Sequence, residues 1–310
     1  MALIQPPLAV NGAVHSARVL RMMVRNLAWS NEGVIEGNDL RVRQMSTPGA
    51  GVRVGDGAAT ILGSISRSQG AYTQTNIGDT VVPVAPAGAQ SRFDLLVLRV
   101  EDPEYEGTRN PETDEIGYFH VIPGVSWFTM SPPAGMSAIP LARIFIPENT
   151  ATITDSMITD LRRIANPRRQ RRLYTSFPSS FSQLTYQDNK WHRWPAAAQW
   201  GVDVPSWATT ATVIVTIAGL RMTRANVYAR MQTSIGTDLG QDTAIDDNQG
   251  NVVRRQTVVI ADTVNISSAQ RGTTQDLRLS TFMSRIETGD LSVDAGTSII
   301  ADIEFVEGRS

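Results

Sequence analysis

Hydrophobic residues recur at two spacings along the chain, and the change of spacing separates one helix from many strands. Residues 14–28 carry apolar side chains at roughly helical spacing, and the arginines of this segment fall on another face. The apolar positions are Val14, Ala17, Leu20, Val24 and Leu27, and the arginines are Arg18, Arg21 and Arg25. We therefore expect one amphipathic helix over residues 14–28.

Beyond Gly33, apolar and polar residues alternate, which is the pattern of half-buried strands. Gly, Pro, Asn or Asp bounds each segment. The strands expected in this part are residues 40–44, 52–54, 58–62, 81–84, 93–100, 119–122 and 139–146. An acidic excursion over residues 101–115 interrupts them, and its simplest interpretation is a solvated loop.

The chain from residue 184 onward again consists of short strand-like segments separated by turn residues. The strands expected here are residues 211–220, 226–232, 251–260, 276–282 and 297–307. Such a series suggests a β-sandwich or jelly roll. Residues 246–250 are similar to a calcium-binding loop but do not keep its ligand register, so a turn is expected there.

Arginine, proline and serine concentrate between these two parts, which is typical of a linker. The expected organisation is an N-terminal arm over residues 1–12, a β-rich domain with one helix over 13–165, a linker over 166–183 and a β-sandwich over 184–310. The predicted fold class is therefore mainly β.

Composition excludes several kinds of chemistry. The chain has no cysteine, which excludes disulfides and thiolate zinc sites. His15, His120 and His192 lack the spacing of shared metal ligands. We expect no catalytic residue, no metal and no cofactor. The longest apolar run is too short for a membrane helix, so no membrane insertion is expected, and the chain is expected to be made in the cytoplasm.

Tryptophans gather in one short stretch at Trp191, Trp194, Trp200 and Trp207. Aromatic faces stack on sugar rings, and neighbouring polar groups can hydrogen-bond hydroxyls. The candidates for a glycan or partner surface are Tyr186, Asp188, Trp191, His192, Trp194 and Trp200. The alternative is that these aromatics fill the sandwich core or a seam between domains. Trp207, in an apolar setting, is assigned to the core.

The arginine run has three interpretations. Arg168, Arg169, Arg171 and Arg172 could contact nucleic acid phosphates, form a solvated linker, or dock on an acidic surface of a neighbouring subunit. The formal net charge of −2 and the lack of interleaved aromatics argue against nucleic acid as a partner. A solvated linker and an assembly contact both stay open. The candidate assembly contact is these four arginines, with residues 101–115 as the candidate acidic partner.

Motifs spread over roughly residues 10–172 occur in a recognisable order. In chain order they are Gly12-Ala13-Val14-His15-Ser16-Ala17, Gly33-Val34-Ile35, Asp39-Leu40-Arg41-Val42, Ser46-Thr47-Pro48-Gly49, Arg92-Phe93-Asp94-Leu95-Leu96-Val97, Leu141-Ala142-Arg143-Ile144 and Asp160-Leu161-Arg162. Together they resemble the minor tail proteins, of the baseplate and tail tip, of long-tailed bacteriophages that infect actinobacteria. The C-terminal domain resembles those of the same proteins with less specificity.

The resemblance implies a virion component at the distal tail. Its first domain would attach to other phage tail proteins and its second would face outward, in a homo-oligomer that is a trimer or occupies a ring position. The leading function is a structural tail protein that binds host cell-envelope glycan through its C-terminal domain. One alternative is a tail-borne polysaccharide depolymerase, which needs a carboxylate pair that a single sequence cannot locate. The other is an architectural adaptor without a ligand.

Overall fold

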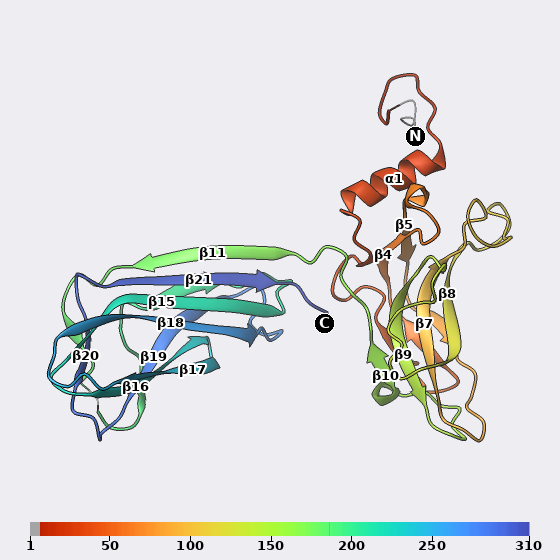
Figure 1. Ribbon diagram of the computed structural model, residues 1–310. Helices are drawn as coiled ribbons and strands as arrows, with labels where there is room; N and C mark the ends of the chain where they lie inside the picture. The colour runs from red at the N-terminus through yellow and green to blue at the C-terminus, as the bar shows by residue number, and fades with distance from the viewer. Residues whose placement is uncertain (1–6, 186, 310) are drawn as a thin grey trace. The chain divides into compact units, whose positions relative to one another are not determined.

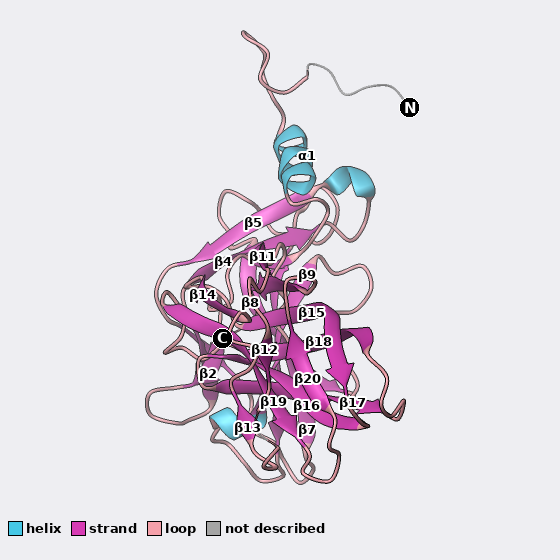
Figure 2. Ribbon diagram, turned by 90° about the vertical axis from the view of Figure 1, so that its left-hand side faces the viewer, coloured by secondary structure: helices cyan, strands magenta, loops and turns pink. Residues whose placement is uncertain are grey.

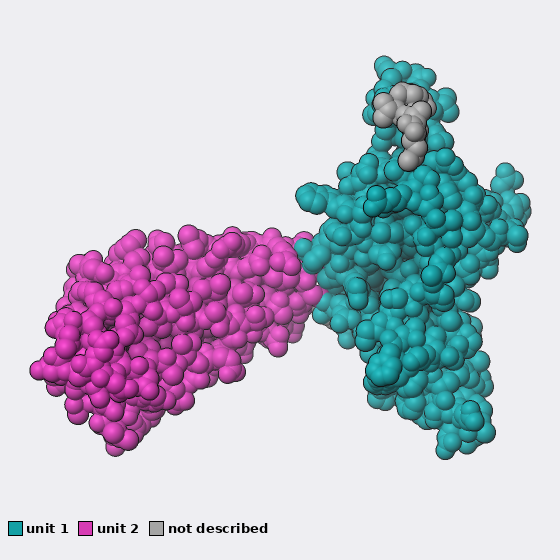
Figure 3. All heavy atoms as spheres, viewed as in Figure 1, with its two compact units in different colours: residues 1–167, 309–310 teal, residues 168–308 magenta. Residues whose placement is uncertain are grey.

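The computed structural model describes residues 7–185 and 187–309, and the chain divides into two compact units. Unit 1 comprises residues up to Pro167 together with Arg309, and unit 2 comprises Arg168–Gly308 (Figure 3). The mainly β fold predicted from the sequence is confirmed, with antiparallel sheets in both units and one α-helix near the N-terminus (Figure 1).

Unit 1 combines helix α1 (Ala17–Leu27) with antiparallel sheets among its described residues. The order β1-β4-β5 forms one sheet, β2-β3-β6 a second and β10-β9-β7-β8 a third. The strands are β1 (Gly33–Val34), β2 (Val42–Gln44), β3 (Gly51–Val54), β4 (Gly57–Leu62), β5 (Ala71–Asn76), β6 (Thr80–Pro83), β7 (Arg92–Val100), β8 (Gly117–Val125), β9 (Ala138–Ile146) and β10 (Ile158–Asp160), with short 3-10 helices at Arg67–Gln69 and Asp155–Met157.

Strand β7 is buried on both faces because its sequence is apolar at consecutive positions. Leu96 and Leu98 belong to the larger core cluster of unit 1, whereas Leu95 and Val97 belong to a smaller cluster on the other side. Alternate side chains of a strand point to opposite faces, so an uninterrupted apolar run needs cover on both. This strand is therefore the centre of the unit.

The Arg-Phe-Asp and Asp-Leu-Arg motifs are structural. Asp94 is 1% exposed and accepts hydrogen bonds from the Arg92 side chain and from the Gly124 backbone N–H. Arg162 is 1% exposed and binds both the Asp160 carboxylate and the carbonyl oxygens of Gly37 and Asp39. Buried guanidinium and carboxylate groups need such partners, so each motif stabilises the fold of unit 1.

Unit 2 is a sandwich of two antiparallel sheets. One has the order β11-β21-β15-β20-β12 with β18 also paired to β15, and the other has the order β13-β19-β16-β17 with β14 also paired to β19. The strands are β11 (Arg169–Ser176), β12 (Ser182–Gln183), β13 (Trp191–His192), β14 (Gln199–Asp203), β15 (Thr210–Thr223), β16 (Val227–Ile235), β17 (Asp238–Asp247), β18 (Arg254–Asn265), β19 (Thr274–Met283), β20 (Asp290–Val293) and β21 (Ser298–Val306).

One hydrophobic core joins the two sheets of unit 2. It takes Val213 and Ile217 from β15, Ile303 from β21, Met231 from β16 and Leu279 from β19. The alternation of buried and half-exposed residues along β15 and β21 matches the period of two that a strand requires.

The expected linker over residues 166–183 is wrong for its central part. Residues 169–176 form strand β11, which pairs with β21 from Arg169↔Val306 to Ser176↔Ile299. The partner strand lies more than a hundred residues further along the chain, so the local composition could not reveal the pairing. β11 is an edge strand, where polar side chains are normal.

Candidate functional site

The tryptophans of residues 191–207 occupy different environments. Trp194 is 6% exposed, its indole N–H donates to the Ser182 hydroxyl at 3.3 Å, and its carbonyl oxygen accepts a hydrogen bond from Thr281. Trp200 and Trp207 are partly buried against the same core. The prediction that Trp194 lies on a glycan surface is therefore wrong, because its ring has no free face, and the assignment of Trp207 to the core is confirmed.

Trp191 differs from the others because it lies on the outer face of its sheet with 37% of its surface exposed. It pairs across strands with Phe282, and the two ring centroids lie 5.8 Å apart at 54°. The Arg230 guanidinium carbon lies 4.6 Å from the Phe282 centroid and 5.6 Å from the Trp191 centroid. A cation over two aromatic faces is attracted by their quadrupoles, which fixes this side chain over both rings.

Polar groups complete this cluster. Arg230 donates to the Asp242 carboxylate at 2.9 Å, and its buried Nε has no hydrogen-bond partner among the described residues. Tyr228 precedes Arg230 by two positions on β16, so both point to the same face, and Tyr228 is 37% exposed. We call Trp191, Tyr228, Arg230, Asp242 and Phe282 the aromatic platform.

The aromatic platform is assembled by register. Trp191 lies opposite Phe282, and Phe282 lies opposite Arg230. Asp242 lies opposite Gln232, two residues along β16 from Arg230. These residues come from β13, β19, β16 and β17, which are neighbours in the sheet. β16 and β17 are consecutive strands, whereas β13 and β19 lie far from them and from each other in sequence. Of the five, the sequence identified only Trp191, and no local signal could have identified the others.

The turn that leads into Trp191 is fixed by Asp188. Its carboxylate lies 2.9 Å from the His192 ring and accepts the backbone N–H of Lys190 at 3.1 Å. The hydrogen bond with His192 lowers the pKa of Asp188, so this carboxyl is ionised near neutral pH. Asp188 and His192 therefore orient the turn. Tyr186, the remaining candidate of this group, lies outside the described residues.

The arginine run is paired within its own unit. Arg168 bonds Glu307, Arg171 bonds Asp302, Arg172 lies 3.2 Å from Asp203, and Arg169 lies 3.6 Å from Glu304. Arg168 also lies over the Trp207 ring. These side chains are 36–70% exposed, so the pairs are surface contacts. The candidate assembly contact therefore stays a prediction.

The acidic excursion is also used within its own unit. Glu104 accepts hydrogen bonds from Arg18 and Arg21 of α1, and Asp102 lies 3.2 Å from Arg21. Hydrogen bonds from Arg18 and then Arg21 lower the pKa of Glu104 to about 2. Arg99 and Arg109 lie within 3.6 Å of Glu101. The loop expected to be simply solvated therefore anchors the helix.

A groove of about 580 Å³ lies in unit 1 where β5, β6 and β8 meet. Each of these is the edge strand of a different sheet. Its lining contains one carboxylate, Glu115, among hydroxyl, amide, aromatic and aliphatic side chains. Glycoside hydrolysis uses two carboxyl groups across the scissile bond, and this groove supplies one.

Among residues 7–185 and 187–309, no three His, Asp or Glu side chains gather in a way that could hold a metal ion. Within the same residues, no helix combines the length and the apolar character needed to span a membrane.

No protein-family model matches the chain, and no curated protein matches it. Among solved structures, the VP2 subviral particle of infectious bursal disease virus is similar at 11% identity and a TM-score of 0.28, over 93% of this chain and 82% of that chain. T=1 particles derived from infectious bursal virus give 12% identity and a TM-score of 0.27, over 90% and 72%. The mosquito-larvicidal Cry4Aa toxin from Bacillus thuringiensis is similar at 9% identity and a TM-score of 0.24, over 89% of this chain and 54% of that chain. Similarities this low carry no conclusion about family or function.

Proposed function

We propose that this chain is a structural protein of a phage virion, located in the minor tail or baseplate at the distal tail, and that it binds host cell-envelope glycan through the aromatic platform. The motifs that resemble actinobacteriophage tail proteins support the first part, since two of them are buried networks on which unit 1 depends. Its proposed partners are other tail proteins, further copies of itself and the glycan. We propose no catalytic activity.

The observation that carries glycan binding is the exposed Trp191 beside an arginine with spare hydrogen-bonding capacity. A guanidinium has five N–H donors, and Arg230 uses one of them on Asp242 among the described residues. A sugar presents an apolar ring face together with hydroxyl groups, so an indole face flanked by donors and a carboxylate suits both. The outer face of a rigid sheet also holds these groups without reorganisation.

Weak binding by one platform is sufficient on a particle. Several copies displayed together convert a low single-site affinity into avidity when their sites engage one surface at the same time. Within unit 2, the exposure of Trp191 and Tyr228, 37% each, supports this use.

The test uses the full chain and polysaccharide fractions extracted from actinobacterial cell envelopes. We expect saturable binding of at least one fraction and about tenfold weaker binding by Trp191→Ala, which corresponds to about 1.4 kcal/mol. Phe177→Ala is the matched control, since Phe177 is an exposed aromatic of unit 2 outside the platform, 68% exposed. Equal binding by Trp191→Ala would overturn the platform as the glycan site, and absence of binding by the unchanged chain would favour an adaptor without a ligand. Release of reducing ends by the purified chain would instead indicate a depolymerase.

A further inference from the structure

Helix α1 packs against unit 1 with its charged face. Arg21 donates to the Gln69 carbonyl oxygen at 2.9 Å, and Arg25 donates to the Arg67 carbonyl oxygen at 2.9 Å. A Cβ added at Gly70 would lie 2.6 Å from the carbonyl carbon of Arg21, so the helix backbone rests directly on this glycine. With Arg18 and Arg21 also bound to Glu104, the arginine face is the inner face of the helix.

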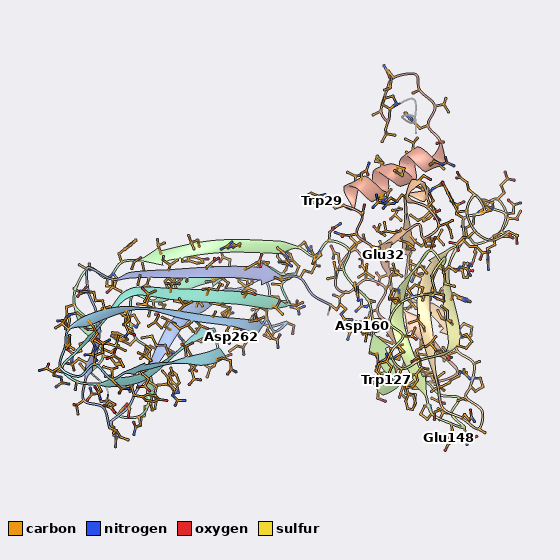
Figure 4. The ribbon with its side chains drawn as sticks, viewed as in Figure 1. Trp29, Glu32, Trp127, Glu148, Asp160 and Asp262 are labelled. Atoms are coloured by element: carbon orange, nitrogen blue, oxygen red, sulfur yellow. The ribbon has the colours of Figure 1, made fainter. Side chains whose placement is uncertain are left out.

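The apolar face of α1 consequently points away from unit 1. Leu20 is 47% exposed and Leu27 is 70% exposed, and α1 has no buried residue. Residues three and four apart share a helix face, so Leu20, Val24 and Leu27 form one stripe. Trp29 follows at the end of the helix (Figure 4) and is 83% exposed. Figure 2 shows that α1 lies beyond the end of β5.

The backbone holds Trp29 in this exposed position. Trp29 has a φ of 56°, in the left-handed region that favours glycine at helix ends. A bulky residue there is strained, and strain that persists in a fold points toward a function for the residue. A large apolar side chain fixed outward beside an apolar stripe is the arrangement of a contact surface.

We infer that the surface formed by Leu20, Val24, Leu27 and Trp29 pairs with the same surface of a second copy of this chain. The stripe itself is uncharged, and the nearby Arg18 and Arg21 are already neutralised by Glu104 and Asp102 on the far side of the helix. Two copies can therefore meet without like-charge repulsion. An apolar stripe is complementary to itself, as an interface between identical subunits requires.

The spacing of the stripe also suits a helix pair. Ala17, Leu20, Val24 and Leu27 follow the alternating four- and three-residue steps of a coiled-coil seam, with β-branched Val24 at one core position and leucines at the other. The helix has 11 residues and is therefore about 16 Å long. Such a short seam buries far less than the ~1,600 Å² of a standard interface, so the pairing is weak in dilute solution.

This inference rests on the assembly part of the proposed function and is independent of the glycan part, because α1 belongs to unit 1 and the aromatic platform to unit 2. Trp191→Ala should leave the pairing unchanged. The two proposals can therefore fail separately.

The absence of cysteine from the sequence allows a direct test by disulfide trapping. Leu20→Cys and Leu27→Cys place one thiol each on the stripe, and Asn26→Cys places one on an exposed position off the stripe of the same helix. Under mild oxidation of the full chain we expect covalent dimers from both leucine variants in roughly tenfold higher yield than from Asn26→Cys, because pairing raises the effective thiol concentration.

Equal yields from all three variants would mean random collision and would overturn the inference. Absence of dimers from the leucine variants would do the same, as would protection of their thiols from a maleimide in the monomer, since the chain's own N-terminal segment would then cover the face. As a non-covalent check, Leu20→Glu should abolish concentration-dependent association in sedimentation, whereas Asn26→Glu should not. Circular dichroism should show both variants folded, because neither side chain is buried.

Discussion

Arg162 of unit 1 and Arg230 of unit 2 each bind an aspartate, but they differ in how much of the guanidinium is used. Arg162 has a fully buried side chain and directs four of its five N–H donors to Asp160 and to two carbonyl oxygens. Arg230 has a side chain that is 38% exposed, and one donor is bound to Asp242. The remaining surface of its guanidinium lies on aromatic rings.

This difference separates a structural arginine from a candidate binding arginine. Where a buried guanidinium directs most of its donors to partners inside the protein, the residue stabilises the fold and offers nothing to a ligand. Where donors remain beside an exposed aromatic, the fold leaves capacity for a ligand. The arginines of α1 and β11 are intermediate, because they are paired with carboxylates but partly exposed.

Arg162→Ala should have the largest effect, on stability. Removing one partner of a buried network leaves the carbonyl oxygens of Gly37 and Asp39 without their donor, so we expect a loss of about 3 kcal/mol in the free energy of unfolding. The neighbouring Arg163→Ala, at an exposed position, is the control. Denaturant unfolding of the full chain should show the loss in one transition. Equal midpoints for the two variants would contradict the structural role.

Arg230→Ala should reverse this pattern. We expect the free energy of unfolding to change by about 1 kcal/mol or less, because the side chain is partly exposed, while binding to an envelope polysaccharide weakens about tenfold. Isothermal titration calorimetry on both arginine variants checks the comparison. If Arg162→Ala lost polysaccharide binding and Arg230→Ala kept it, the structural role of Arg162 and the binding role of Arg230 would both be wrong.

Acid should release helix α1 through Glu104. The hydrogen bonds from Arg18 and Arg21 lower the pKa of Glu104 to about 2, from an ordinary value of 4.5. A lowered carboxyl pKa stabilises the folded state above the unfolded-state pKa, and that contribution disappears as pH falls through about 2. Relative to the intrinsic rate at each pH, amide hydrogen exchange in α1 should therefore accelerate between about pH 4.5 and 2. Glu104→Gln should already show faster exchange at pH 5, and an unchanged rate there would contradict the anchor.

Arg171→Ala should have the smallest effect. Its side chain is 70% exposed and bonds one carboxylate, so we expect little change in the free energy of unfolding. Alanine is more informative than glutamate here, because a glutamate would lie close to Asp302 and destabilise β11 by like-charge repulsion. If Arg168, Arg169, Arg171 and Arg172 replaced together by alanine left oligomerisation intact, the candidate assembly contact would be wrong.

Strands with a strong apolar pattern could be predicted from the sequence, and polar edge strands could not. β7, β9 and β15 were expected within a few residues of their observed bounds, since burial of their faces imposes the pattern. β11 carries charged and polar residues and pairs with a strand more than a hundred residues further along the chain, whereas the polar strand β17 pairs with β16 directly before it. The helix pattern around Leu20 predicted an amphipathic helix, but periodicity alone does not say which face packs inward.

In the candidate site, too, only the residue with a local sequence signal could be predicted. Trp191 was conspicuous because tryptophan is rare and clustered in this chain. Phe282, Arg230 and Asp242 were not, because the strand register that brings them to Trp191 is a property of the folded sheet.

The most direct test of the aromatic platform is the nuclear magnetic resonance spectrum of the tryptophan indole N–H groups during titration with envelope polysaccharide. The sequence has six tryptophans, each giving one such signal. We predict that the Trp191 signal shifts saturably, while those of Trp194 and Trp207 stay in place because both rings pack against the core. A titration in which the polysaccharide binds but the Trp191 signal does not move would contradict the account.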